Sequence, residues 1–363
     1  MKIHMPTKVY SETDCIWNHR DEIAAFGKKA LIVTGHSSAN KNGSLSDMKR
    51  ALSDKDTSFV LFQKIEENPS VETIMEAAAL GRREGTDFVI GIGGGSALDA
   101  AKAIALMVQN RDSDASVLYQ SLPLRSLPVI TVPTTCGTGS EVTQYAILTR
   151  HDKRTKQGIS HSIFPSLAFV DYRYLKSAPD SIIASTAIDA LGHFLESYFN
   201  TQASTYSQML CMHGLAIWGT AKNALLTSET SDEDLRSFLD ASTYAGMAIA
   251  HTSTTIPHGA SYYLTYEKNI PHGVAVGTYL PSYLQLQENK EEVAMILQIM
   301  GFSDIHDFES FIRAVIGIVS LPREEIHIIE EQLIANKRKL PLCPFDTSEK
   351  NLRYMVSSSI VKK

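Results

Sequence analysis

Residues 86–110 read TDFVIGIGGGSALDAAKAIALMVQN, and this stretch decides the fold. A short apolar run ends in three consecutive glycines, and apolar residues at helical spacing follow directly. A strand that enters a helix through glycines is typical of open α/β sheets. We therefore expect a strand over residues 86–96 that leads into a helix over residues 97–110.

The sequence on both sides repeats this alternation. Short runs rich in β-branched residues are separated by patterns of helical period. Strands that are joined by helices can pair in parallel, and the helices then cover both faces of the sheet. We expect a parallel sheet with strands at 28–35, 58–65, 86–96 and 127–135 and helices at 44–54, 68–85 and 97–110.

The second half of the chain has a different character. From about Ser177 the strand signal fades, and long helical patterns replace it. A chain of 363 residues is too long for one compact core, so two domains are expected. We assign residues 1–176 to a Rossmann-like α/β dinucleotide-binding domain and residues 177–363 to an all-helical domain. Its expected helices cover 180–200, 205–226, 231–253, 287–300, 306–319, 322–336 and 348–360.

The composition excludes several classes of partner. The formal net charge is −6 and no run of basic residues forms a patch, so we expect no nucleic-acid and no membrane partner. The most apolar stretch contains Asp99, Lys102 and several glycines, which a membrane span would not tolerate. The N-terminus lacks the apolar core of a secretory signal, and the four cysteines form no CxxC pair. These features predict a cytoplasmic protein.

Two glycine-containing loops are candidates for nucleotide binding. GIGGGSALDAAK (91–102) opens a helix, where free N–H groups and the helix dipole attract phosphate. Its spacing is not the GxGxxG fingerprint, so a tight strand-to-helix turn is the alternative. PTTCGTGSEVT (133–143) follows the next strand and is rich in hydroxyl groups. Loops at the carboxyl ends of adjacent parallel strands form the crevice in which nucleotides bind.

The end of the first predicted strand indicates which dinucleotide binds. It reads VTGHSSANK (33–41) and contains no carboxylate that would bind a ribose 2′-hydroxyl. A 2′-phosphate would meet no repulsion there and would find several donors. This favours NADP(H) over NAD(H), and an ordinary polar loop is the alternative reading. The candidate cofactor contacts in this segment are Gly35, Ser37, Ser38 and Lys41.

Four residues of the second half form a candidate metal site. Asp189 and His193 lie four positions apart, on one face of the predicted helix 180–200. His258 and His272 are the centres of two Pro-His-Gly tripeptides, each of which we expect to close a turn. Taken singly, each of these residues is ordinary. Together, one carboxylate and three imidazoles suit a divalent first-row metal.

These motifs, GGGSALDAAKA, PTTCGTGSEVT, IDALGHFLESY and the two PHG copies, resemble those of the iron-containing (group III) alcohol dehydrogenases. The resemblance extends over nearly the whole chain, and the shorter enzymes similar to 1,3-propanediol dehydrogenase and NADP-dependent alcohol dehydrogenases are the most similar subgroup. It implies a dehydroquinate synthase-like two-domain architecture and a homodimer. The resemblance further implies that Asp189, His193, His258 and His272 hold Fe²⁺. It implies a cofactor site made by Gly94, Gly95, Ser96, Asp99, Thr134, Thr135, Thr138, Ser140 and Lys156.

Asp99, Lys102 and Tyr262 are the candidate catalytic residues. Tyr262 marks a departure from the family, because many relatives have a histidine there, beside the nicotinamide. A proton-relay role for that histidine does not transfer, and Tyr262 would donate a hydrogen bond instead or simply pack. Gly35 stands where NAD-preferring members have an aspartate.

The expected activity is hydride transfer between NADP(H) and a small primary alcohol or diol, such as 1,3-propanediol or butanol, or the corresponding aldehyde. Iron is the family metal, although this ligand set would also accept Zn²⁺. The alternatives on the same fold are a glycerol dehydrogenase-like enzyme and a phosphonoacetaldehyde reductase-like enzyme. A dehydroquinate synthase-like lyase is disfavoured, because the helical half near the ligands lacks a cluster of Lys and Arg.

Overall fold

The computed structural model describes residues 3–227 and 229–363. The chain forms two compact units. One consists of residues 5–178, and the other consists of residues 179–363 together with the described residues before Met5. The predicted boundary between the two domains was between residues 176 and 177. Among the described residues, no helix combines the length and the apolar character needed to cross a bilayer.

The unit of residues 5–178 is built on a parallel six-stranded sheet with the strand order β1-β8-β5-β4-β2-β3. The four predicted strands are confirmed, and the sheet contains two further strands of four residues each. The strands are β1 (Lys8–Ser11), β2 (Lys29–Gly35), β3 (Ser58–Ile65), β4 (Phe88–Gly93), β5 (Val129–Pro133) and β8 (Leu167–Val170).

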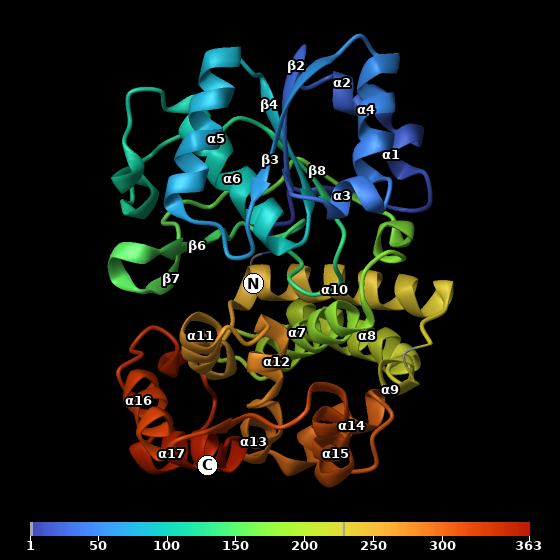
Figure 1. Ribbon diagram of the computed structural model, residues 1–363. Coiled ribbons are helices and arrows are strands. Elements are labelled where there is room, and N and C mark those ends of the chain that lie inside the picture. The colour runs from blue at the N-terminus through green and yellow to red at the C-terminus, as the bar shows by residue number, and fades with distance from the viewer. Residues whose placement is uncertain (1–2, 228) are drawn as a thin grey trace. The chain divides into compact units, whose positions relative to one another are not determined.

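Both faces of this sheet are buried because alternate residues of each strand enter different cores. On β2, Leu31 and Val33 face one core, whereas Ala30 and Ile32 face the other. The first core lies under α5 (Val71–Glu84) and α6 (Gly95–Gln109), and the second lies under α1 (Cys15–Asn18), α2 (Arg20–Ala24) and α4 (Ser44–Asp54). Figure 1 shows α5 on one side of the sheet and α4 on the other. A short helix, α3 (Ser38–Lys41), follows β2, and an antiparallel hairpin joins β6 (Ile147–Arg150) to β7 (Thr155–Gly158).

The unit of residues 179–363 is helical, with one small exception. A parallel pair of two-residue strands, β9 (Ser320–Leu321) and β10 (Val361–Lys362), corrects the all-helical prediction. The predicted helix 205–226 is also divided in two, at residues 222 and 223. The helices are α7 (Asp180–Tyr198), α8 (Thr205–Ala221), α9 (Ala224–Thr227), α10 (Asp232–Thr252), α11 (Ile256–Lys268), α12 (His272–Gly277), α13 (Leu280–Gln285), α14 (Lys290–Ile299), α15 (Ile305–Ile316), α16 (Arg323–Ile334) and α17 (Glu349–Ser359).

The centre of this unit is α7, which is buried at every position from Ala187 to Tyr198. It packs against α8, α10 and α12. A helix that is enclosed on all sides is expected to be apolar all round. The ionisable residues on the buried part of α7 therefore require partners, and they are the candidate site.

Candidate metal centre and nucleotide-binding loops

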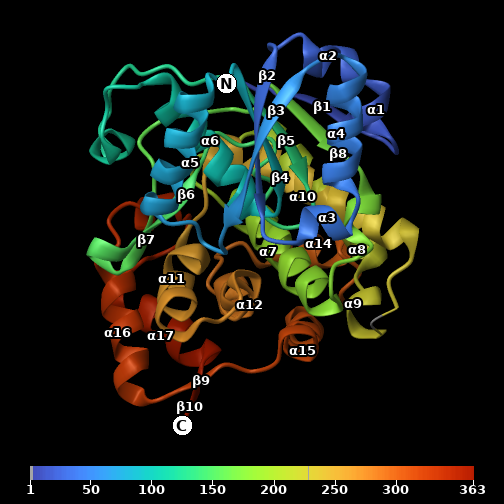
Figure 2. The ribbon, with the colours of Figure 1, turned by 45° about the horizontal axis from the view of Figure 1, so that its top comes forward.

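The two Pro-His-Gly tripeptides begin helices, so the prediction that each closes a turn was wrong. Pro257 occupies the first turn of α11, which places His258 in that turn, and Pro271 immediately precedes α12, whose first residue is His272. Proline is favoured at the start of a helix because its missing N–H would have no partner there. The repeated tripeptide thus presents each imidazole from a helix N-terminus. Figure 2 shows these two helices next to each other.

Three of the four predicted metal ligands converge. Asp189, His258 and His272 each offer one ligand atom, and these atoms all lie within 4.8 Å of one another. Asp189 Oδ1 is 3.4 Å from His258 Nε2 and 3.7 Å from His272 Nε2. His193 lies beside this group rather than within it, with its ring stacked on that of His258 at 4.5 Å between centroids. The structure therefore brings all four residues to one place.

The converging atoms fit a divalent cation. Asp189 Oδ1 and His258 Nε2 are buried and make no hydrogen bond to the described part of the chain. Buried polar atoms without a partner are costly, and a cation among them would remove that cost. Burial opposes ionisation of Asp189, but His193, His272 and His258 together hold the pKa of its carboxyl well below its usual range. One ionised oxygen and three imidazoles form a ligand set of the kind that binds Fe²⁺ or Zn²⁺.

Sequence reasoning missed Glu196, which is completely buried on α7. Its carboxylate accepts hydrogen bonds from the backbone N–H of Thr255 at 2.5 Å and from the Thr255 hydroxyl at 2.9 Å. It also bonds to His258 Nδ1, the ring nitrogen opposite the one that faces Asp189. The signal was available, because positions 189, 193 and 196 recur at helical spacing and share one face of α7.

The two predicted nucleotide loops lie side by side at the carboxyl ends of β4 and β5. α6 begins at Gly95, directly after β4, as the glycine run predicted. A Cβ atom at Gly95 would lie 2.4 Å from Thr138 Cγ2, and one at Gly94 would lie 3.1 Å from Thr135 Cγ2. Position 95 therefore has to be glycine, because any side chain there would prevent the two loops from packing together. Gly94, the residue that precedes α6, has no side chain to cap the helix, so the first N–H groups of α6 are suited to an anion.

Asp99 and Lys102, both on α6, bond to the segment that follows β5 and so connect the two loops. Lys102 is fully buried, and its Nζ donates to the Ser140 hydroxyl and to the Tyr145 carbonyl, both at 2.7 Å. Asp99 accepts from the Ser140 hydroxyl at 2.5 Å and from the Ile147 N–H at 2.8 Å, and it lies 3.8 Å from Lys102. Burial lowers the pKa of Lys102 to about 8, although Asp99 opposes that shift. These contacts show that Asp99 and Lys102 hold the loop after β5 in place. Their catalytic role stays a prediction.

The remaining predicted cofactor residues lie around the same edge of the sheet. Gly35 ends β2, and Ser37 precedes the short helix α3, which begins at Ser38 and ends at Lys41. Thr134 is buried, and its N–H donates to the Gly93 carbonyl at 2.9 Å. The Ser96 hydroxyl accepts from the Asn68 N–H at 3.1 Å. Burial raises the pKa of the Asp99 carboxyl, and the ammonium groups of Lys102 and of Lys156, which lies on β7, oppose that rise.

Tyr262 is one helical turn after His258 on α11. Burial raises the pKa of the Tyr262 hydroxyl to about 12, the carboxylates of Glu196 and Asp189 add to that rise, and the guanidinium of Arg338 opposes it. The hydroxyl is therefore a proton donor at neutral pH, within electrostatic reach of the predicted metal ligand Asp189.

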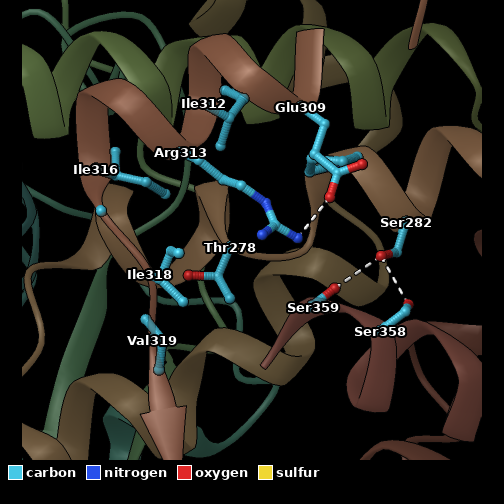
Figure 3. A pocket seen from close by; sticks show the side chains of 12 residues that line it. Thr278, Ser282, Glu309, Ile312, Arg313, Ile316, Ile318, Val319, Ser358 and Ser359 are labelled. Atoms are coloured by element: carbon cyan, nitrogen blue, oxygen red, sulfur yellow. Dashed lines mark hydrogen bonds and ion pairs between the residues drawn. The ribbon is translucent and has the colours of Figure 1, made fainter. Parts of the chain in front are cut away.

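A hollow elsewhere in this unit is a poor candidate for a binding site. It has a volume of about 30 Å³ and lies between α13, α15 and α17 (Figure 3). Its polar groups already have partners, because Arg313 pairs with Glu309 at 2.6 Å and Ser282 bonds to both Ser358 and Ser359 at 2.9 Å. A space of this size holds no more than a few water molecules.

Comparisons with known proteins point to one family. Residues 6–172 match the family described as iron-containing alcohol dehydrogenase, and residues 183–321 match the C-terminal part of the Fe-containing alcohol dehydrogenase family. The crystal structure of an iron-containing alcohol dehydrogenase from Thermotoga maritima is similar, with a TM-score of 0.91 and 34 % identity over 99 % of this chain and 99 % of that chain.

The match to this chain covers different shares of two curated relatives. The probable alcohol dehydrogenase EutG of Escherichia coli (strain K12) is 32 % identical over 261 residues, which are 71 % of this chain and 66 % of EutG, just under two thirds of that relative. The NADPH-dependent butanol dehydrogenase of Clostridium saccharobutylicum is 27 % identical over 330 residues, which are 86 % of this chain and 83 % of that enzyme.

Proposed function

Because the chain belongs to the iron-containing alcohol dehydrogenase family, we propose that it is a metal-dependent alcohol dehydrogenase and aldehyde reductase. It transfers hydride between NADP(H) and a small primary alcohol or diol, such as butanol or 1,3-propanediol. The convergence of Asp189, His258 and His272 on one point is the observation that carries this proposal.

Asp189, His193, His258 and His272 are the residues that would hold the metal. We assign Fe²⁺ as the native ion, and the same donors would accept Zn²⁺. When bound, such an ion lowers the pKa of an alcohol hydroxyl and polarises an aldehyde carbonyl. The chain keeps Asp189 ionised as a ligand and excludes water from the ligand atoms, since Asp189 and His258 are 3 % and 4 % exposed.

The cofactor is assigned to the loops around α6 and to the end of β2. The partly exposed backbone at the start of α6 suits the pyrophosphate, and Thr135 and Thr138 adjoin it. NADP(H) is preferred because the segment from Gly35 to Lys41 contains no carboxylate and ends in an exposed lysine. The NADPH-dependent butanol dehydrogenase is a relative with that dependence. The proposed contacts are Gly35, Ser37, Ser38, Lys41, Gly94, Gly95, Ser96, Asp99, Thr134, Thr135, Thr138, Ser140 and Lys156.

Tyr262 is proposed to donate a hydrogen bond at the substrate end of the site, in place of the histidine that the family resemblance implies there. Its hydroxyl stays protonated throughout the neutral range because its pKa is about 12. It would therefore orient a substrate oxygen rather than accept a proton from it.

The assembly proposed is a cytoplasmic homodimer. β1 is the outermost strand on its side of the sheet and pairs in the sheet with β8. The outer edge of such a strand is suited to pairing with a second copy. No disulfide joins cysteines of the described residues, which fits a reducing compartment.

A direct test is the oxidation of NADPH by the iron-loaded protein in the presence of butanal or 3-hydroxypropanal. We expect one NADPH to be consumed for each aldehyde reduced, and Asp189→Ala to lose this activity while retaining NADPH binding. Absence of turnover by metal-loaded wild-type protein with every aldehyde of a panel would contradict the proposal.

Arg338 favours a second candidate substrate class, the short aldehydes that carry an anionic group. Its guanidinium is exposed and lies within electrostatic reach of the Tyr262 hydroxyl, one turn from His258. A phosphonate or sulfonate would find a charged donor there. If anions are preferred, Arg338→Ala will raise KM for phosphonoacetaldehyde and leave KM for butanal unchanged. Equal effects on both substrates would exclude this class.

A further inference from the structure

The contacts of Glu196 all converge on the segment that presents His258. Two of its hydrogen bonds come from Thr255, the residue immediately before α11, and the third partner is His258 Nδ1. A histidine whose Nδ1 is bound to a carboxylate can offer only Nε2 to a metal. Nε2 is the nitrogen that lies 3.4 Å from Asp189. Glu196 therefore determines that Nε2 is the ring nitrogen of His258 that can bind a metal.

The connector between α10 and α11, residues 253–255, has a strained backbone. Ser253 adopts φ 66° and ψ 177°, a combination that is nearly confined to glycine. The surrounding contacts hold it there: the Ser253 N–H donates to the Ile249 carbonyl at 2.8 Å, and the Ser253 carbonyl accepts from the Thr252 hydroxyl at 3.2 Å. Strain of this kind persists only where neighbouring contacts impose it.

Lys339 supplies a further restraint on the same connector. Its Nζ donates to the carbonyl of Thr254 at 2.6 Å and to the Thr254 hydroxyl at 2.5 Å. Its Cγ lies 3.7 Å from where a Cβ of Gly259 would be, so its aliphatic stem packs against the first turn of α11. Lys339 comes from the segment after α16, so a distant part of the chain anchors the residues that precede His258.

We propose that Glu196 and Lys339 are positioning residues that hold the strained connector of residues 253–255, so that His258 is presented to the metal through Nε2. Glu196 fixes the imidazole and Thr255, and Lys339 fixes Thr254. The inference rests on the proposed metal site, because it concerns how one of its ligands is oriented. It does not require either residue to touch the substrate or the cofactor.

The test compares Co²⁺ binding by metal-free wild-type protein with that of Glu196→Gln and Lys339→Met. Glutamine keeps the shape of Glu196 but places an N–H₂ group where a carboxylate oxygen accepts. We expect Glu196→Gln to weaken Co²⁺ binding by about 10- to 100-fold and to change the visible absorption spectrum of the bound ion. Lys339→Met should weaken binding by about fivefold or more, a smaller effect because it acts through Thr254 rather than on the ligand. NADPH binding should be unchanged in both variants.

Lys268→Met is the matched control, since Lys268 lies on the same helix as His258 and pairs with Glu325 at 2.5 Å. It should bind Co²⁺ like the wild type. Ser253→Gly removes strain without removing a contact of Glu196 or Lys339, and it should raise the melting temperature of the metal-free protein. An unchanged or lowered melting temperature would overturn the assignment of strain to the connector.

The outcomes separate the two proposals. If wild-type protein binds no Co²⁺, the metal site itself fails, and with it the proposed function. If the wild type binds Co²⁺ and both Glu196→Gln and Lys339→Met bind it equally well with the same spectrum, only the positioning role is overturned. Should Glu196→Gln fail to fold, as judged by circular dichroism and NADPH binding, Lys339→Met decides alone, and wild-type affinity in that variant overturns the proposal.

Discussion

Gly273 follows the predicted metal ligand His272, and replacing it with alanine tests how closely α12 must approach α7. A Cβ atom at position 273 would lie 1.7 Å from the carbonyl oxygen of Ser185 and 2.6 Å from the carbonyl carbon. Ser185 is on α7, one turn before Asp189. Because the obstructing atoms are helix backbone, no side-chain rotation can relieve the overlap.

The size of the effect follows from this overlap. Cβ atoms essentially never approach other heavy atoms within 3.0 Å, so the two helices would have to separate by about 1.3 Å at this point. Metal–ligand distances tolerate changes of only about 0.2 Å. We expect Gly273→Ala to weaken Co²⁺ binding by at least about 100-fold and to lower the free energy of unfolding by about 3 kcal/mol, as overpacked cores do.

Gly259, the glycine of the other Pro-His-Gly copy, provides the matched control. A Cβ there would lie 3.1 Å from Asn336 Nδ2, the end of a side chain that can move. Alanine is favoured over glycine inside a helix by about 1 kcal/mol, so Gly259→Ala should be neutral or stabilising. Urea denaturation of the metal-free proteins and Co²⁺ titration measure both quantities. Equal stability and equal Co²⁺ affinity in the two alanine variants would refute the reasoning.

Three further predictions concern the nucleotide-binding unit and the cysteines. Gly35→Asp should raise KM for NADPH by about tenfold or more and lower KM for NADH, because a carboxylate repels a 2′-phosphate and binds a 2′-hydroxyl; unchanged cofactor preference would count against the assignment. Lys102→Met should weaken NADPH binding and leave Co²⁺ binding intact. Because the pKa of Lys102 in the folded chain is about 8, below its ordinary 10.5, the unfolded chain binds the extra proton between those values. The wild type should therefore gain stability relative to Lys102→Met as the pH rises from about 8 to about 10. A difference that stays constant over this range would contradict a lowered pKa of Lys102 in the folded chain. The four cysteines are buried, and burial raises the thiol pKa of Cys211 and Cys343 to about 12, so native protein at pH 8 should react with a thiol reagent far more slowly than the four thiols released by denaturant.

The sheet was predictable where the strands are long and apolar. β2 and β3 were identified within a residue because their runs are bounded by polar turns. β1 and β8 contain four residues each, and their pairing joins Lys8 to Leu167, a contact that no local pattern can indicate. The helix starts at His258 and His272 were mistaken for turns because Pro-His-Gly reads as a turn motif when its tertiary context is unknown.

The sequence indicated the four candidate ligands, but the residues that support them were not identified from it. Asp189 and His193 share a helix face, which the sequence shows directly, whereas the convergence of His258 and His272 on Asp189 depends on how α11 and α12 pack. Lys102 was predicted to be catalytic on the family resemblance, and that role stays a prediction. Lys102 is buried because the loop of residues 140–145 covers it, and sequence periodicity contains no information on that contact.

The central claim is that Asp189 and three histidines bind one divalent ion, and metal stoichiometry tests it most directly. Protein reconstituted with Co²⁺ or Fe²⁺ and freed of excess metal is analysed by elemental analysis, with His306→Ala, an exposed histidine of the same unit, as the control. We expect about one ion per chain in the wild type and in His306→Ala, and less than about a tenth of that in Asp189→Ala, which should still bind NADPH. A full equivalent of metal in Asp189→Ala, with the same Co²⁺ spectrum as the wild type, would contradict the account.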